Sequence, residues 1–183
     1  MDKHRKVIIT GSQGTGKTSL LNALSGTYCT VDEVSREIIA AQQKANLNAT
    51  PWGDVEQYAN LVFRKMHAQY KKQDTKLCIY DRAMPDLIAY LKFRKKKVPI
   101  NIYHSINKYL QNPVVFFAPI WEDIYIKDLQ RPENFEATIA ISSIIKTTYL
   151  ELGFELIELK KESVKARKAF IENTLSTQYK FLF

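Results

Sequence analysis

Residues 11–18 carry the strongest chemical signal in the sequence, because they read GSQGTGKT and fit the pattern G-x-x-x-x-G-K-[ST]. This run follows apolar residues 7–10 and precedes an amphipathic stretch at 19–24, which is the strand–loop–helix context that a phosphate-binding P-loop requires. Such a loop turns its backbone N–H groups around an anion, and the next helix adds its N-terminal dipole. The sequence therefore predicts a nucleoside triphosphate site made of Gly11, Ser12, Gln13, Gly14, Thr15, Gly16, Lys17, Thr18 and Ser19.

Two P-loop residues have distinct expected roles. We expect Lys17 to reach the outer phosphates and the hydroxyl of Thr18 to ligate the Mg²⁺ that neutralises them. The nucleotide and cofactor predicted from this motif are ATP and Mg²⁺, and the sequence leaves a strict preference for ATP over GTP open.

A carboxylate follows the apolar run at residues 76–80. This run ends in Asp81, which gives it the shape of a Walker-B strand. An acid in that position orients the water shell of Mg²⁺, so Asp81 is the second predicted metal ligand beside Thr18. Its neighbour Arg82 is a candidate for gripping the phosphate that is transferred.

A second carboxylate pair, Asp32 and Glu33, follows the apolar run at 28–31. Glu33 is placed to take a proton from a substrate hydroxyl or to hold that hydroxyl by a hydrogen bond. The alternative is that the acids only cap a helix, with Arg36 paired to one of them. The spacing alone leaves both interpretations open.

The polar segment at residues 121–135 is long for a plain connection and contains Lys127, Gln130 and Arg131. P-loop kinases place a mobile lid here, whose basic residues fold over the phosphates and exclude water. An ordinary surface loop is the alternative. Further along, Arg167 lies on a predicted helix, where it either stacks on adenine or faces solvent.

The apolar pattern predicts five strands separated by helices, and therefore a parallel sheet wrapped on both faces. The strands are expected at residues 6–10, 28–31, 76–80, 114–118 and 154–159. One helix face is predicted to hold Val55, Tyr58, Ala59, Val62, Met66 and Tyr70, and another Ala137, Ala140, Ile141, Ile144, Ile145 and Thr148. Ligands of such sheets bind at the carboxyl ends of the strands.

Composition fits one domain spanning residues 1–183, since 45% of the residues are hydrophobic. No run of about eighteen apolar residues occurs, so we expect no membrane span. Cys29 and Cys78 lie in strand-like runs, which favours reduced, buried thiols and a cytoplasmic location. The net charge of +8 fits phosphorylated substrates, and nothing beyond that charge favours nucleic acid.

Several segments together resemble the NadR-like P-loop ATPase/kinase family, which is related to ribosylnicotinamide kinases and to nucleoside and nucleotide kinases. After the P-loop they are EVSREII at 33–39, DRAMPDLIAYL at 81–91, WEDIYIKDLQRPENFEA at 121–137, YLELGFELIEL at 149–159 and SVKARKAFI at 163–171. The resemblance implies a P-loop NTPase fold with strand order 2-3-1-4-5 and a small lid at about 121–135. It also implies Arg131 as the lid arginine, Asp81 near Mg²⁺ and Glu33 on the substrate side.

Two functions follow from these residues. The first is a small-molecule kinase that transfers the γ-phosphoryl group of ATP to a nucleoside- or metabolite-type acceptor. The second is a nucleotide-binding regulatory ATPase module with a protein or lipid partner. A small GTPase is disfavoured, because residues 107–110 read NKYL and lack the aspartate of an Asn-Lys-x-Asp motif. The acceptor and the oligomeric state are left open.

Overall fold

A five-stranded parallel sheet forms the centre of the computed structural model, which describes residues 6–71, 77–111, 113–125 and 134–178. The strands are β1 (Lys6–Thr10), β2 (Cys29–Val31), β3 (Cys78–Asp81), β4 (Val114–Phe117) and β5 (Leu156–Glu158). They lie in the order β2-β3-β1-β4-β5, so the predicted order 2-3-1-4-5 is confirmed. All four strand pairs are parallel, which brings the carboxyl ends of the strands to one edge of the sheet.

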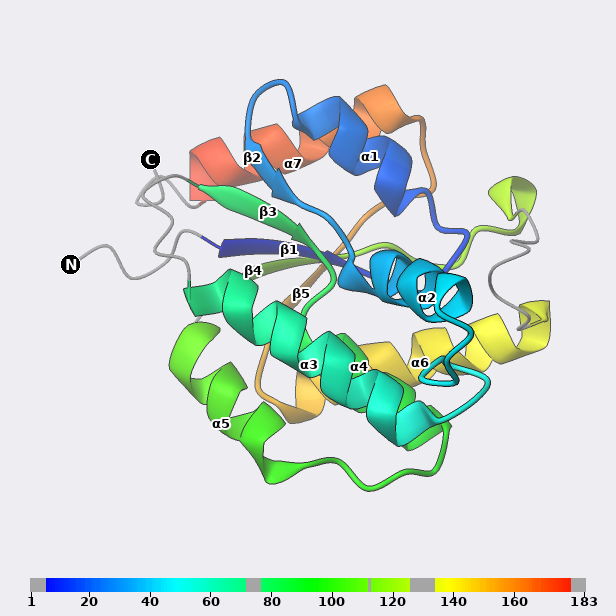
Figure 1. Cartoon of the computed structure of the whole chain (residues 1–183). Coiled ribbons are helices and arrows are strands. Elements are labelled where there is room, and N and C mark those ends of the chain that lie inside the picture. The colour runs from blue at the N-terminus through cyan, green and yellow to red at the C-terminus, as the bar shows by residue number, and fades with distance from the viewer. Residues whose placement is uncertain (1–5, 72–76, 112, 126–133, 179–183) are drawn as a thin grey trace.

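Helices cover both faces of the sheet, as the alternating pattern predicts (Figure 1). One face carries α1 (Lys17–Leu24) and α7 (Val164–Gln178), which pack against each other. The other helices are α2 (Val34–Lys44), α3 (Val55–Lys71), α4 (Met84–Phe93), α5 (Ile100–Tyr109), a short 3₁₀ helix η1 (Glu122–Ile124) and α6 (Phe135–Glu151). Of these, α3, α4, α5 and α6 form the opposite layer (Figure 1).

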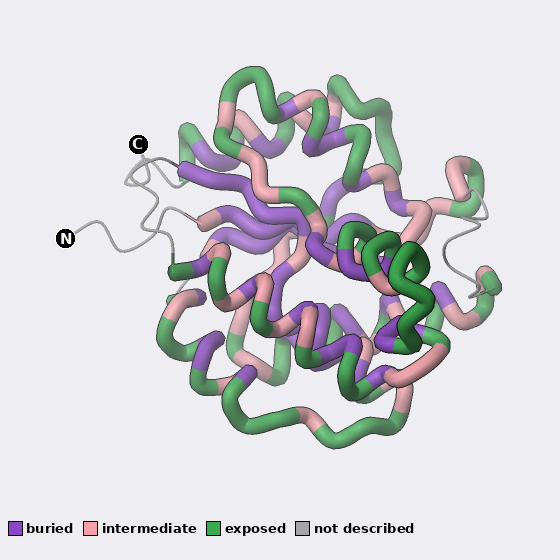
Figure 2. The backbone as a smooth tube through the Cα atoms, in the orientation of Figure 1, coloured by how far each residue is buried: buried purple, intermediate pink, exposed green. Residues whose placement is uncertain are grey.

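Alternation along the strands divides the core into two layers. In β1, Ile8 joins the cluster formed with α3, α4 and α6, whereas Val7 and Ile9 join the cluster formed with α1 and α7. This is the period-two alternation of a strand that is covered on both faces. Figure 2 shows the central strands buried almost throughout.

Local sequence explains where α3 begins and which of its faces is buried. Asp54 accepts a hydrogen bond through Oδ1 from the backbone N–H of Gln57 at 2.9 Å, which caps the start of α3. The predicted apolar face of α3 is confirmed, because all six residues are buried: Val55, Tyr58, Ala59, Val62, Met66 and Tyr70.

Two predictions from the apolar pattern need correction. The buried residues of α6 are Thr138, Ser142, Ile145, Thr148 and Tyr149. Ile145 and Thr148 of the predicted face are thus confirmed, whereas Ala137, Ile141 and Ile144 are half-buried and Ala140 is exposed. Thr138 and Ser142 are buried although they are polar, so hydrophobic periodicity missed part of the buried face. Cys29 is exposed because β2 is an edge strand, and only Cys78 is a buried thiol.

The structure also bears on membrane insertion. Among the described residues, no helix combines the length and the apolar character that crossing a bilayer would need.

Candidate functional site

The P-loop connects β1 to α1 in a conformation that needs glycine. Gly11, Gly14 and Gly16 have φ angles of 135°, 70° and 77°, all in the left-handed half of conformational space. A Cβ atom on Gly11 would lie 2.3 Å from the carbonyl oxygen of Ala118, directly after β4. The loop therefore sits against the sheet in a position that a larger residue could not occupy.

Lys17 begins α1 and folds back across the P-loop. Its residue is 6% exposed, and Nζ donates hydrogen bonds to the carbonyl oxygen of Ser12 and, at 3.2 Å, to Oγ1 of Thr15. Thr18 and Ser19 lie on the exposed side of the same first turn. No acidic residue occupies that turn, so its backbone N–H groups and the ammonium group together favour an anion.

Asp81 ends β3 and lies beside Ile9 of β1, one residue before Thr10. The residue is 8% exposed, and its Oδ1 has no hydrogen-bond partner among the described residues. Burial raises the pKa of Asp81 to about 6, with the positive charge of Lys17 opposing the shift. A buried carboxylate oxygen without a donor is a site that a cation would satisfy.

The donor set fits Mg²⁺, which prefers oxygen ligands and usually keeps several waters beside one or two protein ligands and phosphate oxygens. Thr18 in the first turn of α1 and Asp81 at the end of β3 would supply a hydroxyl and a carboxylate. Within the described ranges, no three His, Cys, Asp or Glu side chains gather into a metal cluster. A magnesium ion here would therefore depend on the nucleotide for further ligands.

Arg82 follows Asp81 and has a φ angle of 68°, an uncommon conformation for a residue other than glycine. Its side chain is held at three points. Nη1 donates to the carbonyl oxygen of Gly11 at 2.7 Å, Nε pairs with Oε1 of Glu33 at 3.0 Å, and Nη1 lies 3.4 Å from Oδ1 of Asp86. Burial opposes the charged form, but Glu33 and Asp86 outweigh it and raise the pKa of Arg82.

Glu33 stands directly before α2 but makes no side-chain capping hydrogen bond to that helix. Its carboxylate points instead toward Arg82, while Arg36 lies on the exposed side of α2. Glu33 therefore forms an ion pair with Arg82 and makes no capping hydrogen bond, whereas the pairing of Arg36 stays a prediction. Two strand ends that are 49 positions apart in sequence thus supply one ion pair.

Asp86 is a member of the site that sequence reasoning missed. The residue is 6% exposed, and its carboxylate accepts hydrogen bonds from the hydroxyls of Thr10 and Tyr149, each at 2.6 Å. The backbone N–H of Ala83 donates to it at 2.9 Å. The sequence shows only that Asp86 lies in the first turn of a helix. Its contact with Tyr149 could not be predicted, because the two residues are 63 positions apart.

Arg167 is the second missed residue, because the sequence suggested adenine stacking or solvent exposure. It is 3% exposed on α7, and its Nη1 donates to the carbonyl oxygen of Thr15 in the P-loop at 2.8 Å. Its Nε has no hydrogen-bond partner among the described residues, and burial lowers its pKa. Arg167 therefore places a buried cation behind the P-loop.

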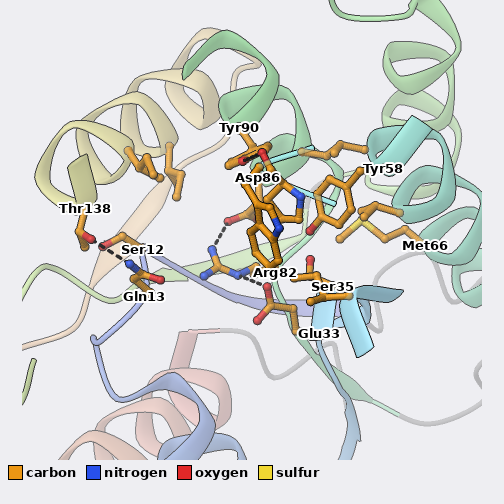
Figure 3. Close-up of a pocket in the computed structure, with 17 residues that line it drawn as sticks. Ser12, Gln13, Glu33, Ser35, Tyr58, Met66, Arg82, Asp86, Tyr90 and Thr138 are labelled. Atoms are coloured by element: carbon orange, nitrogen blue, oxygen red, sulfur yellow. Dashed lines mark hydrogen bonds and ion pairs between the residues drawn. The ribbon is translucent and has the colours of Figure 1, made fainter. Parts of the chain in front are cut away.

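A pocket opens from the P-loop between α2, α3, α4 and α6, with about 760 Å³ of empty space that is partly open to solvent. Figure 3 shows Arg82 between Glu33 and Asp86, with Gln13 and Thr138 on one side and Tyr58 and Met66 on the other. The lining residues are Ser12, Gln13, Glu33, Ser35, Ile39, Pro51, Trp52, Tyr58, Val62, Met66, Arg82, Asp86, Leu87, Tyr90, Thr138, Ile141 and Ile145.

The stem of the predicted lid contacts the P-loop. A Cβ atom on Gly14 would lie 2.6 Å from the ring of Tyr125, and that ring meets Phe135 edge to face with centroids 4.9 Å apart. The basic residues predicted for the lid, Lys127 and Arg131, and their polar neighbour Gln130 lie outside the described residues.

Comparison with known proteins places this geometry in a wider group. A family model described as an AAA domain matches residues 6–167, nearly the whole chain. The sequence of this chain matches no curated protein.

Three solved structures share the fold over almost their whole lengths. A deoxyadenosine kinase from M. mycoides has a TM-score of 0.66 and 18% identity, covering 94% of this chain and 99% of that one. A thymidylate kinase from Candida albicans gives 0.64 and 13%, with coverages of 98% and 94%. A shikimate kinase from Acinetobacter baumannii gives 0.57 and 14%, with coverages of 97% and 96%. At these identities the likeness establishes the fold of P-loop kinases.

Proposed function

Because the chain belongs to this AAA-domain family, we propose that it is an ATP-dependent phosphotransferase, a kinase that acts on a hydroxyl group of a small molecule. The γ-phosphoryl group of Mg-ATP is the group transferred. The NadR-like resemblance of its sequence segments and a cytoplasmic location belong to the same proposal.

One observation carries this proposal, namely that the pocket and the P-loop share residues. Ser12 and Gln13 belong to the anion-binding loop and also line the pocket. Phosphoryl transfer requires the acceptor to lie in line with the terminal phosphate, so a kinase needs a second cavity that opens onto the loop. A regulatory ATPase module needs only the nucleotide site.

The described residues divide the work of binding and transfer. Lys17 pairs with the outer phosphates, and Thr18 and Asp81 are the groups that would hold Mg²⁺. Glu33 holds the acceptor hydroxyl and accepts its proton, since the other carboxylate of the pocket, Asp86, already accepts hydrogen bonds from Thr10, Tyr149 and Ala83. Arg82 fixes Glu33 and faces the transferring phosphate. Arg131 enters the proposal from the sequence alone, as the cation that closure brings in.

Bound Mg²⁺ would neutralise charge on the phosphate oxygens. The chain supplies the rest by position: buried walls that exclude water, and a guanidinium locked between two carboxylates. Such preorganisation lowers the reorganisation needed when charge shifts in the transition state.

The test is ADP release from Mg-ATP across a panel of nucleosides, vitamins and their monophosphates. A kinase releases ADP at a rate that rises with one acceptor class, and Lys17→Ala abolishes this release because the charge facing the phosphates is lost. Lys44→Ala, at the exposed end of α2, is the matched control and should behave as wild type. ADP release that no acceptor stimulates would favour the regulatory ATPase instead.

The three solved kinases do not choose the acceptor, because the compounds in their names differ in charge. Deoxyadenosine is uncharged, shikimate is a carboxylate and thymidylate is a phosphate ester. The acceptor class must be argued from the pocket of this chain.

A further inference from the structure

The charged side chains of the pocket are unevenly balanced. Among the residues that line it, only Arg82 is positive, whereas Glu33 and Asp86 are both negative. One positive and two negative side chains give the described lining a net formal charge of −1. Coulomb interactions across a few ångströms are strong in a buried site, so this imbalance selects among ligands by their charge.

Arg82 is also paired with both of these carboxylates. It contacts the carboxylate of Glu33, the carboxylate of Asp86 and the carbonyl oxygen of Gly11 at 3.0, 3.4 and 2.7 Å. Its side chain is 11% exposed and that of Glu33 is 12% exposed. An anionic acceptor would have to draw Arg82 away and leave a buried carboxylate without its partner, which is costly.

The remainder of the pocket is mostly apolar and aromatic. Tyr58 and Tyr90 meet edge to face with ring centroids 6.2 Å apart, and Met66 lies beside them (Figure 3). The hydroxyl of Tyr90 donates to the carbonyl oxygen of Pro51 at 2.9 Å, which turns this polar group toward the wall. Trp52 lines the same pocket and is 41% exposed. Such surfaces fit a flat or aliphatic group without charge.

We propose that the acceptor carries no negative charge: it is an uncharged or cationic molecule with a hydroxyl near Glu33 and a flat apolar part among Tyr58, Met66 and Tyr90. That the ligand is a phosphoryl acceptor rests on the proposed function, whereas the selection by charge is a property of the pocket itself. Phosphorylated compounds and hydroxy acids are excluded by Glu33 and Asp86. Nucleosides are the simplest class that combines these features.

The test is equilibrium binding by calorimetry with the P-loop filled by Mg²⁺ and a non-hydrolysable ATP analogue, so that no phosphoryl transfer is needed. Matched pairs differ only by a phosphate: adenosine and AMP, cytidine and CMP, thymidine and TMP, with shikimate as a carboxylate probe. We expect at least one nucleoside to bind, and its monophosphate to bind about tenfold more weakly or worse. Shikimate should bind no better than the monophosphates.

A charge variant sharpens the result. Glu33→Gln brings the net formal charge of the lining to zero and leaves Arg82 paired with Asp86 alone, so the preference for nucleoside over monophosphate should shrink to about threefold or less. The matched control is Glu37→Gln, one turn further along α2, where the side chain is 72% exposed and pairs with Lys65. It should keep the wild-type preference.

Two outcomes overturn the inference: a monophosphate or shikimate that binds as well as or better than the uncharged compounds, or binding by none of the uncharged compounds. Turnover of a monophosphate would overturn the inference while supporting the proposed function. Selective nucleoside binding without any ADP release would do the reverse.

Discussion

Two buried arginines donate hydrogen bonds to the backbone of the P-loop, and they differ in whether carboxylates neutralise their charge. Arg82 donates to the carbonyl oxygen of Gly11 at 2.7 Å, and Arg167 donates to that of Thr15 at 2.8 Å. Arg82 also pairs with Glu33 and Asp86, whereas no acidic partner of Arg167 lies among the described residues. The pKa of Arg82 is raised by these carboxylates, and the pKa of Arg167 is lowered by burial.

This difference separates two uses of a positive charge. A cation matched by carboxylates contributes little net field but fixes the geometry of everything it touches, so Arg82 shapes the pocket beside the P-loop. A cation without a counter-ion keeps its field, and the nearest groups that field can reach are the backbone and side chains of the P-loop. Arg167 is therefore expected to strengthen binding of phosphates rather than to shape the pocket.

The largest effect should come from removing the compensated arginine. Arg82→Ala leaves the carboxylates of Glu33 and Asp86 buried without their cation, so we expect the free energy of unfolding to fall by about 3–5 kcal/mol. Turnover should fall by about a thousandfold, since Glu33, the proposed base, loses the guanidinium that fixes its position. Chemical denaturation and a steady-state assay measure the two.

Arg82→Lys serves as the second variant if the alanine protein folds poorly. It keeps the charge but loses the forked geometry, so it should be more stable than Arg82→Ala and still deficient in turnover. Wild-type turnover in the lysine variant would show that only the charge of Arg82 matters.

An intermediate effect is expected from Asp81→Asn, because this carboxylate is buried without a hydrogen-bond partner at Oδ1. Turnover should fall about a hundredfold, equivalent to about 3 kcal/mol in the transition state. The ligand-free variant should nevertheless melt about a few degrees higher than wild type at pH 8. Burial raises the pKa of Asp81 to about 6, so its ionised form opposes folding above that pH.

The sign of this stability effect is testable across pH. The unfolded chain ionises Asp81 near pH 4, so wild-type stability should fall as pH rises from about 4 to about 6, whereas the asparagine variant lacks this loss. The difference in melting temperature should therefore vanish near pH 4 and be largest above pH 7. A variant that melts lower than wild type at pH 8 would assign Asp81 a structural role.

The smallest effect should come from Arg167, which has no acidic partner within the part of the chain that the structure describes. Arg167→Met keeps much of the side-chain length and removes a buried charge together with one hydrogen bond, so the melting temperature without ligand should change by about a few degrees at most. Affinity for Mg-ADP should fall about tenfold, because the field behind the P-loop is lost. Calorimetry measures this, with Arg64→Met on the exposed side of α3 as control. A large loss of stability with unchanged ADP affinity would make Arg167 a packing residue.

Features with a local signature could be predicted from the sequence. The strand–loop–helix unit of the P-loop, the five strands and the buried face of α3 each have a pattern within one short segment. All of them were predicted from the sequence and are present in the structure. The expectation that ligands bind at the carboxyl ends of parallel strands also drew attention to Glu33 and Arg82. It did not predict that the two side chains contact each other. Their pairing depends on β2 and β3 being neighbours, which no local pattern encodes.

The missed residues share a different property, because their partners lie far away in the chain. Asp86 depends on Tyr149 of α6, and Arg167 depends on the carbonyl of Thr15, so neither motif is visible within one segment. The buried face of α6 was predicted only in part, because Thr138 and Ser142 are buried although they are polar. The prediction that Cys29 is buried was wrong because a short edge strand exposes a residue that a central strand would bury.

The contact between Arg167 and Thr15 also bears on how the protein is made. The two residues are 152 positions apart, so the ribosome releases the P-loop long before it releases the helix that supports it. Chains grow at about 5–20 residues per second, which leaves an interval of several seconds or more during synthesis. Throughout that time the nascent chain carries its phosphate-binding motif without the cation behind it. Nucleotide in the cell is therefore expected to act on the finished fold, and not as a template for the growing one.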